Sequence, residues 1–219
     1  MKKEKFSTKV LAEIAIFAAL AFALDALQGG IWKGVFINGG SIGFAMVPVF
    51  VISYRRGLLP GVLCGFILSV VQMLGGIYII QGKTLEGAFL QAAGPFIQVM
   101  LDYVLAYTVV GFTGAFAGLY AKGKTKGQRI LWIIVGCVVG GLLKYICHIL
   151  AGIWFWPGEM WGVGGVGYSF LYNGLYCIPN IIICTAIMII LAVAYPQFLN
   201  PNKIVEAEEE PVNEEAHQE

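Results

Sequence analysis

Apolar residues gather in six runs along the chain, separated by short segments that carry most of the polar and charged residues. Runs of this length without a polar face are typical of helices surrounded by lipid. The second run is short, whereas the fourth is long enough to tilt or to begin in the interface, and Pro95 is expected to bend it. The predicted helices cover residues 9–28, 41–55, 58–80, 88–121, 129–154 and 169–195.

The chain length fits these six helices. One crossing of a bilayer takes ~20 residues, so 219 residues suffice for one domain of about six crossings. We therefore expect an all-α membrane protein with six transmembrane helices within residues 1–199. The first run is too long for the core of a signal peptide and is interpreted as a retained crossing. Residues 200–219 are acidic and interrupted by proline, which predicts a disordered, solvated tail.

Composition narrows the class of protein further. Hydrophobic residues make up 58% of the chain and charged residues 12%, and the mean hydropathy is +0.79. A soluble domain of this size could not bury so much apolar surface, and a net charge of +1 does not suit a nucleic-acid-binding protein. Neither a P-loop nor a metal-ligand spacing is present, so we expect neither ATP hydrolysis nor a metal site. The five cysteines lie in apolar runs and are expected to be buried, inert thiols.

Lysine and arginine predict the orientation. With the N-terminus inside, the cytoplasmic side receives eleven of these residues, the outer loops receive Lys33 and Lys83, and Lys144 lies within a helix. The excess of positive charge on cytoplasmic loops is a general property of membrane proteins. It places both termini in the cytoplasm and agrees with an even number of crossings.

Few ionisable side chains interrupt the apolar runs. Each costs about 2.5–3.5 kcal/mol at the centre of a membrane-spanning helix, so each needs a partner or a function. Glu13 is near the inner end of its helix and is expected to snorkel, while Asp25 is expected to cap or hinge the end of the first helix. The complete set is Glu13, Asp25, Asp102, Lys144 and His148.

Four groups from different segments reach a similar depth. Counted from the nearest cytoplasmic anchor at 1.5 Å per helical residue, the depth is roughly 28–34 Å for all of them. They are Trp32, Asp102, His148 and Asn173. Such convergence predicts one pocket that opens outward between the helices, and the alternative is a set of unrelated interfacial anchors.

The surroundings of this pocket leave alternatives open. Lys144 and His148 are four residues apart and share a helix face, so a structural ion pair between Asp102 and Lys144 would neutralise the acid. Residues 153–169 contain three tryptophans, which either anchor the segment in the interface or stack on a flat cationic ring. Residues 28–41 form either a plain connector or a lid.

Two further functions follow from the same residues. Proton coupling through Asp102 or His148 would make the chain a self-sufficient carrier. A triad of Asp102, His148 and Ser169 would make it an intramembrane hydrolase, although nothing in the spacing favours a triad over a pocket.

Several segments together resemble one known family, the thiamine-specific binding subunits of energy-coupling-factor (ECF) vitamin transporters of Gram-positive bacteria. The resemblance covers residues 8–196, and its specific parts are K-Y-x-x-H-x-x-x-G-x-x-F-W and Y-S-x-x-x-N-G. The segments are TKVLAEIAIFAALAFAL (Thr8–Leu24), NGGSIGFAMVP (Asn38–Pro48), YRRGLLPGVLCG (Tyr54–Gly65), MLDYVLAY (Met100–Tyr107), LLKYICHILAGIWFW (Leu142–Trp156) and YSFLYNG (Tyr168–Gly174).

The resemblance implies a binding protein of the bacterial plasma membrane, not an enzyme. It implies that six helices hold one thiamine near the outer face beneath a lid, without a cofactor. A transmembrane coupling subunit and two ATPase subunits would drive uptake, and Ala15 and Ala19 match the alanines that face the coupling subunit. The partners so implied are thiamine, these subunits and lipid, but no nucleic acid.

The resemblance also implies a set of ligand-binding residues. Trp32, Trp156 and His148 match groups that contact the rings of the ligand, and Asp102 matches the acid that faces its positive charge. The other matching positions are Tyr103, Gly152, Tyr168 and Asn173.

Thiamine combines a charged thiazolium with a flat aminopyrimidine. A site for it needs a carboxylate, aromatic faces and an amide or phenol, which these positions offer. Lys144 is expected either to point away from the ligand or to share Asp102 with it.

Overall fold

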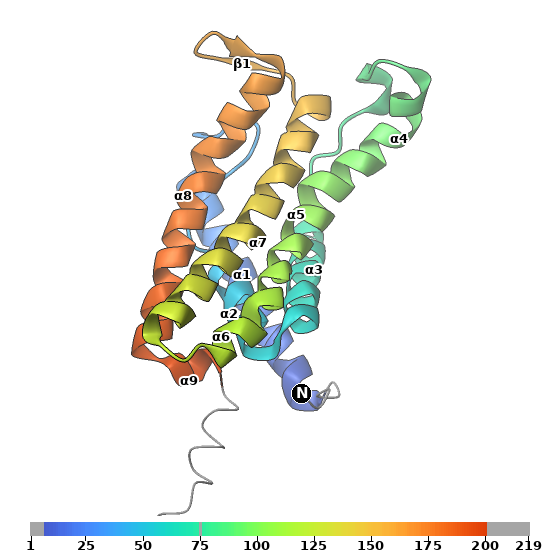
Figure 1. Ribbon diagram of the computed structural model, residues 1–219. Helices are drawn as coiled ribbons and strands as arrows, with labels where there is room; N and C mark the ends of the chain where they lie inside the picture. Colours follow the sequence, from blue (N-terminus) through green and yellow to red (C-terminus); the bar gives the residue numbers. More distant parts are fainter. Residues whose placement is uncertain (1–6, 75, 201–219) are drawn as a thin grey trace, which may run out of the picture.

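The computed structural model describes residues 7–74 and 76–200, which form one bundle of helices (Figure 1). A helical stretch between α3 and α7 passes through π-helical (η2) and 3₁₀ (η3) segments. The elements are α1 (Thr8–Ile31), α2 (Val47–Arg56), α3 (Leu58–Leu74), η1 (Gly82–Thr84), α4 (Ala88–Val99), η2 (Met100–Leu105), α5 (Ala106–Thr108), η3 (Val109–Phe116), α6 (Ala117–Lys122), α7 (Lys126–Phe155), β1 (Glu159–Met160), β2 (Val163–Gly164), α8 (Gly165–Ala194) and α9 (Pro196–Leu199).

The length and hydropathy of the helices indicate a membrane protein. Within the described residues, α1, α7, α8 and the stretch Ala88–Lys122 are long and apolar enough to cross a bilayer. Large apolar side chains cover the outside of the bundle; Ile16 and Ile182 are each 64% exposed. Because α3 has 17 residues and α2 has only 10, the number of six crossings stays a prediction. The predicted disordered tail lies outside the described residues, apart from Asn200.

Several predicted boundaries are wrong. Helix α1 extends to Ile31, and α2 begins only at Val47, where Pro48 stands in the first turn, a position that tolerates proline. Helix α3 ends at Leu74 rather than near residue 80, and Gly76 has a φ of 114°, outside the helical region. The segment before α8 also contains an unpredicted antiparallel hairpin, β1–β2, with Trp161 76% exposed in its turn.

The fourth predicted helix has the expected extent but not a regular geometry. Pro95 lies inside α4, and the six residues after Val99 form the π-helical segment η2, which carries Asp102 and Tyr103. Proline removes a main-chain donor, and π-helical turns often occur at functional sites.

The two ends of the described chain and two arginines lie at one end of the bundle. The starts of α1 and α9 lie there, whereas β1–β2 and the start of α4 lie at the opposite end (Figure 1). The carboxylate of Glu13 accepts hydrogen bonds from Arg55 and Arg56 at 2.6–3.1 Å, so it is paired within the protein, and the expected snorkelling of Glu13 stays a prediction. We call this the arginine end and the opposite one the hairpin end.

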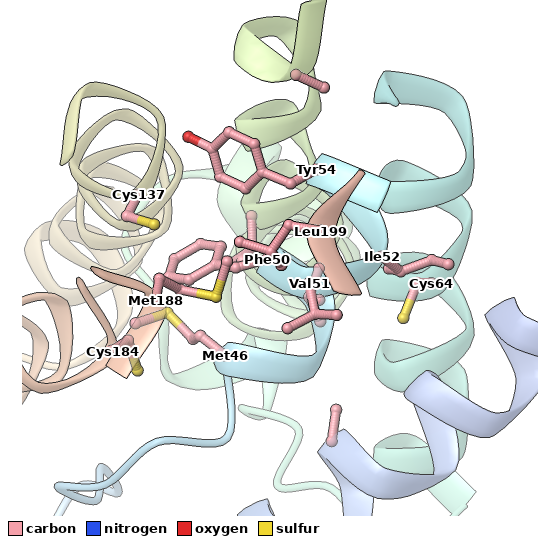
Figure 2. Close-up of a cluster of buried hydrophobic side chains, with 14 of the residues drawn as sticks. Met46, Phe50, Val51, Ile52, Tyr54, Cys64, Cys137, Cys184, Met188 and Leu199 are labelled. Carbon is pink, nitrogen blue, oxygen red and sulfur yellow. The ribbon is translucent and has the colours of Figure 1, made fainter. Parts of the chain in front are cut away.

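A continuous apolar core fills the bundle around α2. Figure 2 shows Phe50, Ile52 and Met188 in this core, with Cys64, Cys137 and Cys184 among them. All five cysteines are free and buried, as predicted.

Helix α3 and η3 are in main-chain contact. A Cβ atom added at Gly111 would overlap main-chain atoms of Gly61 and Val62. Since main-chain atoms cannot move aside as a flexible side chain can, this contact requires glycine.

We therefore expect Gly111→Ala to lower the free energy of unfolding by about 1–3 kcal/mol through overpacking. Thermal unfolding in detergent, followed by tryptophan fluorescence, measures the effect. The matched control is Gly118→Ala in α6, where nothing lies within 4 Å of an added Cβ. Equal melting temperatures for the two variants would contradict the close contact.

Candidate ligand-binding site

A cavity of about 720 Å³ lies toward the hairpin end of the bundle. It is bordered by the last turns of α1, the loop 33–46, Tyr78, η2, α5, α7 and α8. All eight residues predicted to bind a ligand line this one cavity, namely Trp32, Asp102, Tyr103, His148, Gly152, Trp156, Tyr168 and Asn173. Their contact with a ligand stays a prediction, but the structure brings them together.

The loop 33–46 is fastened to α8 by tyrosine hydroxyls. The hydroxyl of Tyr172 accepts from the main-chain N–H of Asn38 at 2.8 Å and donates to the carbonyl of Gly39 at 2.9 Å. The side-chain amide of Asn38 also donates to the hydroxyl of Tyr168 at 3.1 Å. The loop thus lies against the cavity rather than extending away from it, although whether it opens and closes as a lid is untested.

Polar side chains of α1 and α8 hold the second half of this loop. The amide of Gln28 donates to Ser41 Oγ at 2.9 Å, while its carbonyl oxygen accepts from Ala45 N at 3.2 Å. The amide of Asn180 accepts from Gly43 N at 2.6 Å and donates to the carbonyl of Ser41 at 2.8 Å. The loop therefore bridges the end of α1 and the middle of α8.

Asp102 is the acidic centre of the hairpin end of the cavity. Its Oδ2 accepts from Gln98 Nε2 at 3.0 Å and from Trp156 Nε1 at 2.8 Å. Its Oδ1 lies 3.6 Å from His148 Nδ1, which is too far for a hydrogen bond. The side chains of Asp102 and His148 are only 15% and 13% exposed. The carboxylate is therefore held in place but retains accepting capacity toward the cavity.

Gln98 links Asp102 to the segment after α3. Its carbonyl oxygen accepts from Ile80 N at 3.3 Å, and its amide donates to the carbonyl of Tyr78 at 3.2 Å. Because the Ile80 N–H can only donate, the amide nitrogen of Gln98 must face Asp102. The hydroxyl of Tyr103 also accepts from Tyr78 N at 3.2 Å, so Tyr103 positions this segment as well.

Aromatic rings border the same space. The Tyr78 and Trp156 ring centroids are 5.3 Å apart, and those of His148 and Tyr176 are 5.9 Å apart. From the loop 33–46, Phe36 packs edge-on against Tyr176 at 5.5 Å. The electron-rich faces of such rings suit a flat, positively charged ring.

The predicted polar residues of α8 are engaged within the protein. The amide nitrogen of Asn173 donates to the carbonyls of His148 and Ser169, and its oxygen accepts from the Tyr176 hydroxyl at 2.5 Å. Ser169 Oγ donates to the carbonyl of Ile149 at 2.8 Å. A side chain at Gly152 would overlap Ser169 Oγ, so this glycine allows α7 and α8 to approach.

These contacts do not support a catalytic triad. A triad requires the serine hydroxyl to donate to the histidine, whereas that of Ser169 donates to a main-chain carbonyl.

A second polar group lies deeper, beside the core. The carboxylate of Asp25 accepts from the side-chain amides of Gln28 (3.3 Å) and Gln72, and the ammonium of Lys144 lies 4.0 Å from the centroid of the Tyr107 ring. Asp25 lies within α1 and faces the cavity, so the predicted capping or hinge role is wrong.

Lys144 also borders the cavity, beside Asp25, and its expected orientation away from a ligand stays a prediction. Among the described residues, no acid lies within 4.0 Å of its ammonium, so the alternative of a direct Asp102–Lys144 ion pair does not hold.

Sequence reasoning missed most of the supporting residues. Uncharged polar side chains such as Gln72, Gln98 and Asn180 do not stand out in an apolar run. The signal that could have identified Gln98 is its position one turn before Asp102 on the same helix face.

These features define a membrane protein with an internal cavity that combines an anchored carboxylate, aromatic rings and a fastened loop. Comparison with known proteins identifies the family. Residues 11–200 match the family model described as "Thiamine transporter protein", and the chain belongs to this family. It is a family of transport proteins rather than enzymes, and the match confirms the resemblance drawn from the sequence.

Individual relatives cover nearly the whole chain. The chain is 32% identical over 201 residues to the thiamine transporter ThiT of Bacillus subtilis, covering 88% of this chain and 95% of that protein. The thiamine transporter ThiT of Lacticaseibacillus paracasei is 26% identical over 196 residues, with 86% and 89% covered. A solved structure of ThiT from Listeria monocytogenes has a TM-score of 0.68 at 26% identity and covers 88% of this chain and 97% of that one.

We expect Tyr172→Phe to loosen the loop 33–46, because it removes two hydrogen bonds worth about 0.5–1.5 kcal/mol each. Proteolysis requires the main chain around the already exposed Lys33 to open locally and fit the trypsin active site, so cleavage after Lys33 should be about tenfold faster. Mass spectrometry of timed digests measures the rate. Tyr145→Phe is the control, because that hydroxyl donates to Phe170 O and not to the loop. Identical cleavage rates in the two variants would contradict the anchoring.

Proposed function

We propose that the chain binds thiamine in the 720 Å³ cavity and serves as the substrate-binding subunit of an ATP-driven vitamin importer in the bacterial plasma membrane. The observation that carries the proposal is the arrangement of Asp102. Its carboxylate is oriented by Gln98 and Trp156 and is surrounded by aromatic rings, in a chain whose relatives are named thiamine transporters.

The two halves of thiamine match two parts of the cavity. The thiazolium carries a permanent positive charge and is assigned to Asp102, with Trp156 and His148 offering ring surfaces. The aminopyrimidine is assigned to Tyr168 and Asn173 on α8. Since the Asn173 amide bonds within the protein, its contribution is to fix Tyr176 and the α7 main chain around the ligand. Trp32 and Tyr103 complete the lining, and no cofactor is proposed.

We expect micromolar thiamine to quench the tryptophan fluorescence of the purified protein, because Trp32 and Trp156 line the cavity, whereas biotin should not. Asp102→Asn should weaken thiamine binding about 10- to 100-fold by removing the counter-charge. Titration of fluorescence against thiamine concentration measures both affinities.

The control for this titration is Glu159→Gln, which removes a carboxylate from the hairpin rather than from the cavity lining. It should leave thiamine affinity unchanged. Absence of quenching in the wild-type protein would count against thiamine as the ligand, and equal losses in both variants would contradict the role of Asp102.

The proposed topology has six crossings with both termini cytoplasmic. The lysine and arginine distribution supports this orientation, and both ends of the described chain lie at the arginine end (Figure 1). Residues 1–199 then form a single substrate-binding domain, followed by the acidic tail. The cavity lies toward the opposite end and would receive its ligand from outside.

The proposed partners are a transmembrane coupling subunit and two ATPases of the ECF type. Ala15 and Ala19 are both exposed on the outside of α1, one turn apart, and small residues at this spacing let another helix approach closely. This surface is separate from the cavity, so binding and coupling should be separable by mutation.

We expect the double variant Ala15→Trp/Ala19→Trp to bind thiamine normally but to lose ATP-driven uptake, because the indoles keep the coupling subunit at a distance. Thiamine accumulation in vesicles that contain the complete complex measures uptake. The control is Ala186→Trp, at an exposed alanine on α8. Uptake by the chain alone, driven by a pH gradient, would instead support the alternative of a proton-coupled carrier.

A further inference from the structure

The cavity contains a second carboxylate, Asp25, which the proposed contacts with thiamine do not use. It comes from the last two turns of α1 and lies deeper than Asp102, beside the apolar core. Of its two oxygens, Oδ1 accepts from Gln28 Nε2 at 3.3 Å and Oδ2 accepts from Gln72 Nε2. Burial of an acid in an apolar bundle costs free energy, so an acid that accepts from two amide donors there is expected to have a function.

The hydrogen-bond pattern corresponds to the ionised acid. An ionised carboxylate only accepts, whereas a protonated one must donate its O–H to an acceptor. The orientation of the Gln28 amide is fixed, because its oxygen accepts from the Ala45 N–H, which can only donate. Its nitrogen therefore faces Asp25, and both hydrogen-bond partners of the Asp25 carboxylate are amide donors.

Lys144 is the cation associated with this acid. Asp25 and Lys144 border the same small void of about 10 Å³, which Asp102 does not border. The void is about the size that one water molecule occupies. The ammonium also lies over the ring of Tyr107, where the electron-rich face attracts it. Lys144 is thus held at the deep end of the cavity, away from Asp102.

The charged side chains that line the cavity therefore lack one positive charge to be neutral overall. Two acids and one buried lysine give a net charge of −1, while Lys33 lies on the exposed loop, where water screens its charge. Without Asp25, the charges of Lys144 and Asp102 would cancel, and an entering cation would meet no net attraction.

We propose that Asp25 is a positioning residue that holds Lys144 at the deep end of the cavity and, by balancing its charge, makes the cavity selective for ligands with a single positive charge. This inference rests on the proposed function and deepens it. Asp25 acts through Lys144 rather than by touching the ligand.

The test compares thiamine with its neutral analogue in which carbon replaces the charged thiazolium nitrogen. Asp25→Asn should weaken thiamine binding about 10- to 100-fold, because the Lys144 charge then opposes the ligand, and should change the affinity of the analogue by less than about threefold. Fluorescence titration of the detergent-solubilised full chain gives both affinities. Unchanged binding of the analogue also shows that the variant is folded.

Removal of the lysine provides the decisive control. The double variant Asp25→Asn/Lys144→Met should bind thiamine at least about fivefold more tightly than Asp25→Asn alone, because the opposing charge is gone. Equal losses for thiamine and the analogue, or failure of Lys144→Met to rescue, would overturn the role of Asp25 and show that the residue only supports the fold. Full thiamine affinity in Asp25→Asn would also overturn it. Absence of thiamine binding by the wild-type protein would overturn the proposed function itself.

Discussion

Carboxylates inside an apolar bundle can stay ionised only if the protein supplies the hydrogen bonds that water would otherwise provide, and the cavity depends on this constraint. Asp102 receives the indole N–H of Trp156 and the amide of Gln98, while Asp25 receives two glutamine amides. Each of these donors comes from a defined position in the fold. The position of the cavity therefore follows from the hydrogen bonds that these donors make with the two acids.

The same donors also fasten the irregular parts of the chain. Gln98 binds Asp102 and the main chain around Tyr78, and Gln28 binds Asp25 and the loop 33–46. Loss of either glutamine would free a segment and an acid together. Because each glutamine contacts both an acid and an irregular segment, a change in the position of the segment also changes the surroundings of the acid.

Helical periodicity accounts for what could be predicted from the sequence. The rise per residue is constant, so counting from charged anchors predicts Trp32, Asp102, His148 and Asn173 near one another, and the structure brings all four to one cavity. The start of α2 and the end of α3 could not be predicted in the same way. The loops beside them contain apolar residues, so the hydrophobic pattern does not distinguish these loops from the ends of the helices. The π-helical segment at Asp102 leaves no mark on the hydrophobic pattern either.

Pairings between distant segments could not be predicted. The contact of Asn38 with Tyr172 spans 134 residues, and that of Gly43 with Asn180 spans 137. The sequence predicts Asp25 at the end of the first helix, whereas the helix continues to Ile31 and Asp25 borders the cavity. A side-chain amide can hydrogen-bond to many different groups, and its actual partner depends on which groups the folded bundle brings within reach.

The attachment of the loop 33–46 to α8 has a kinetic consequence. Were the loop to act as a lid, a molecule enclosed beneath it would leave only after the hydrogen bonds of Asn38, Gly39 and Ser41 with α8 had broken together. Its dwell time would then depend on how fast these hydrogen bonds between the loop and α8 break together, and not on its own affinity for the rings and acids of the cavity. Displacement of the outer turns of α8 would carry the loop with it and shorten that dwell time without altering a single residue that touches the molecule.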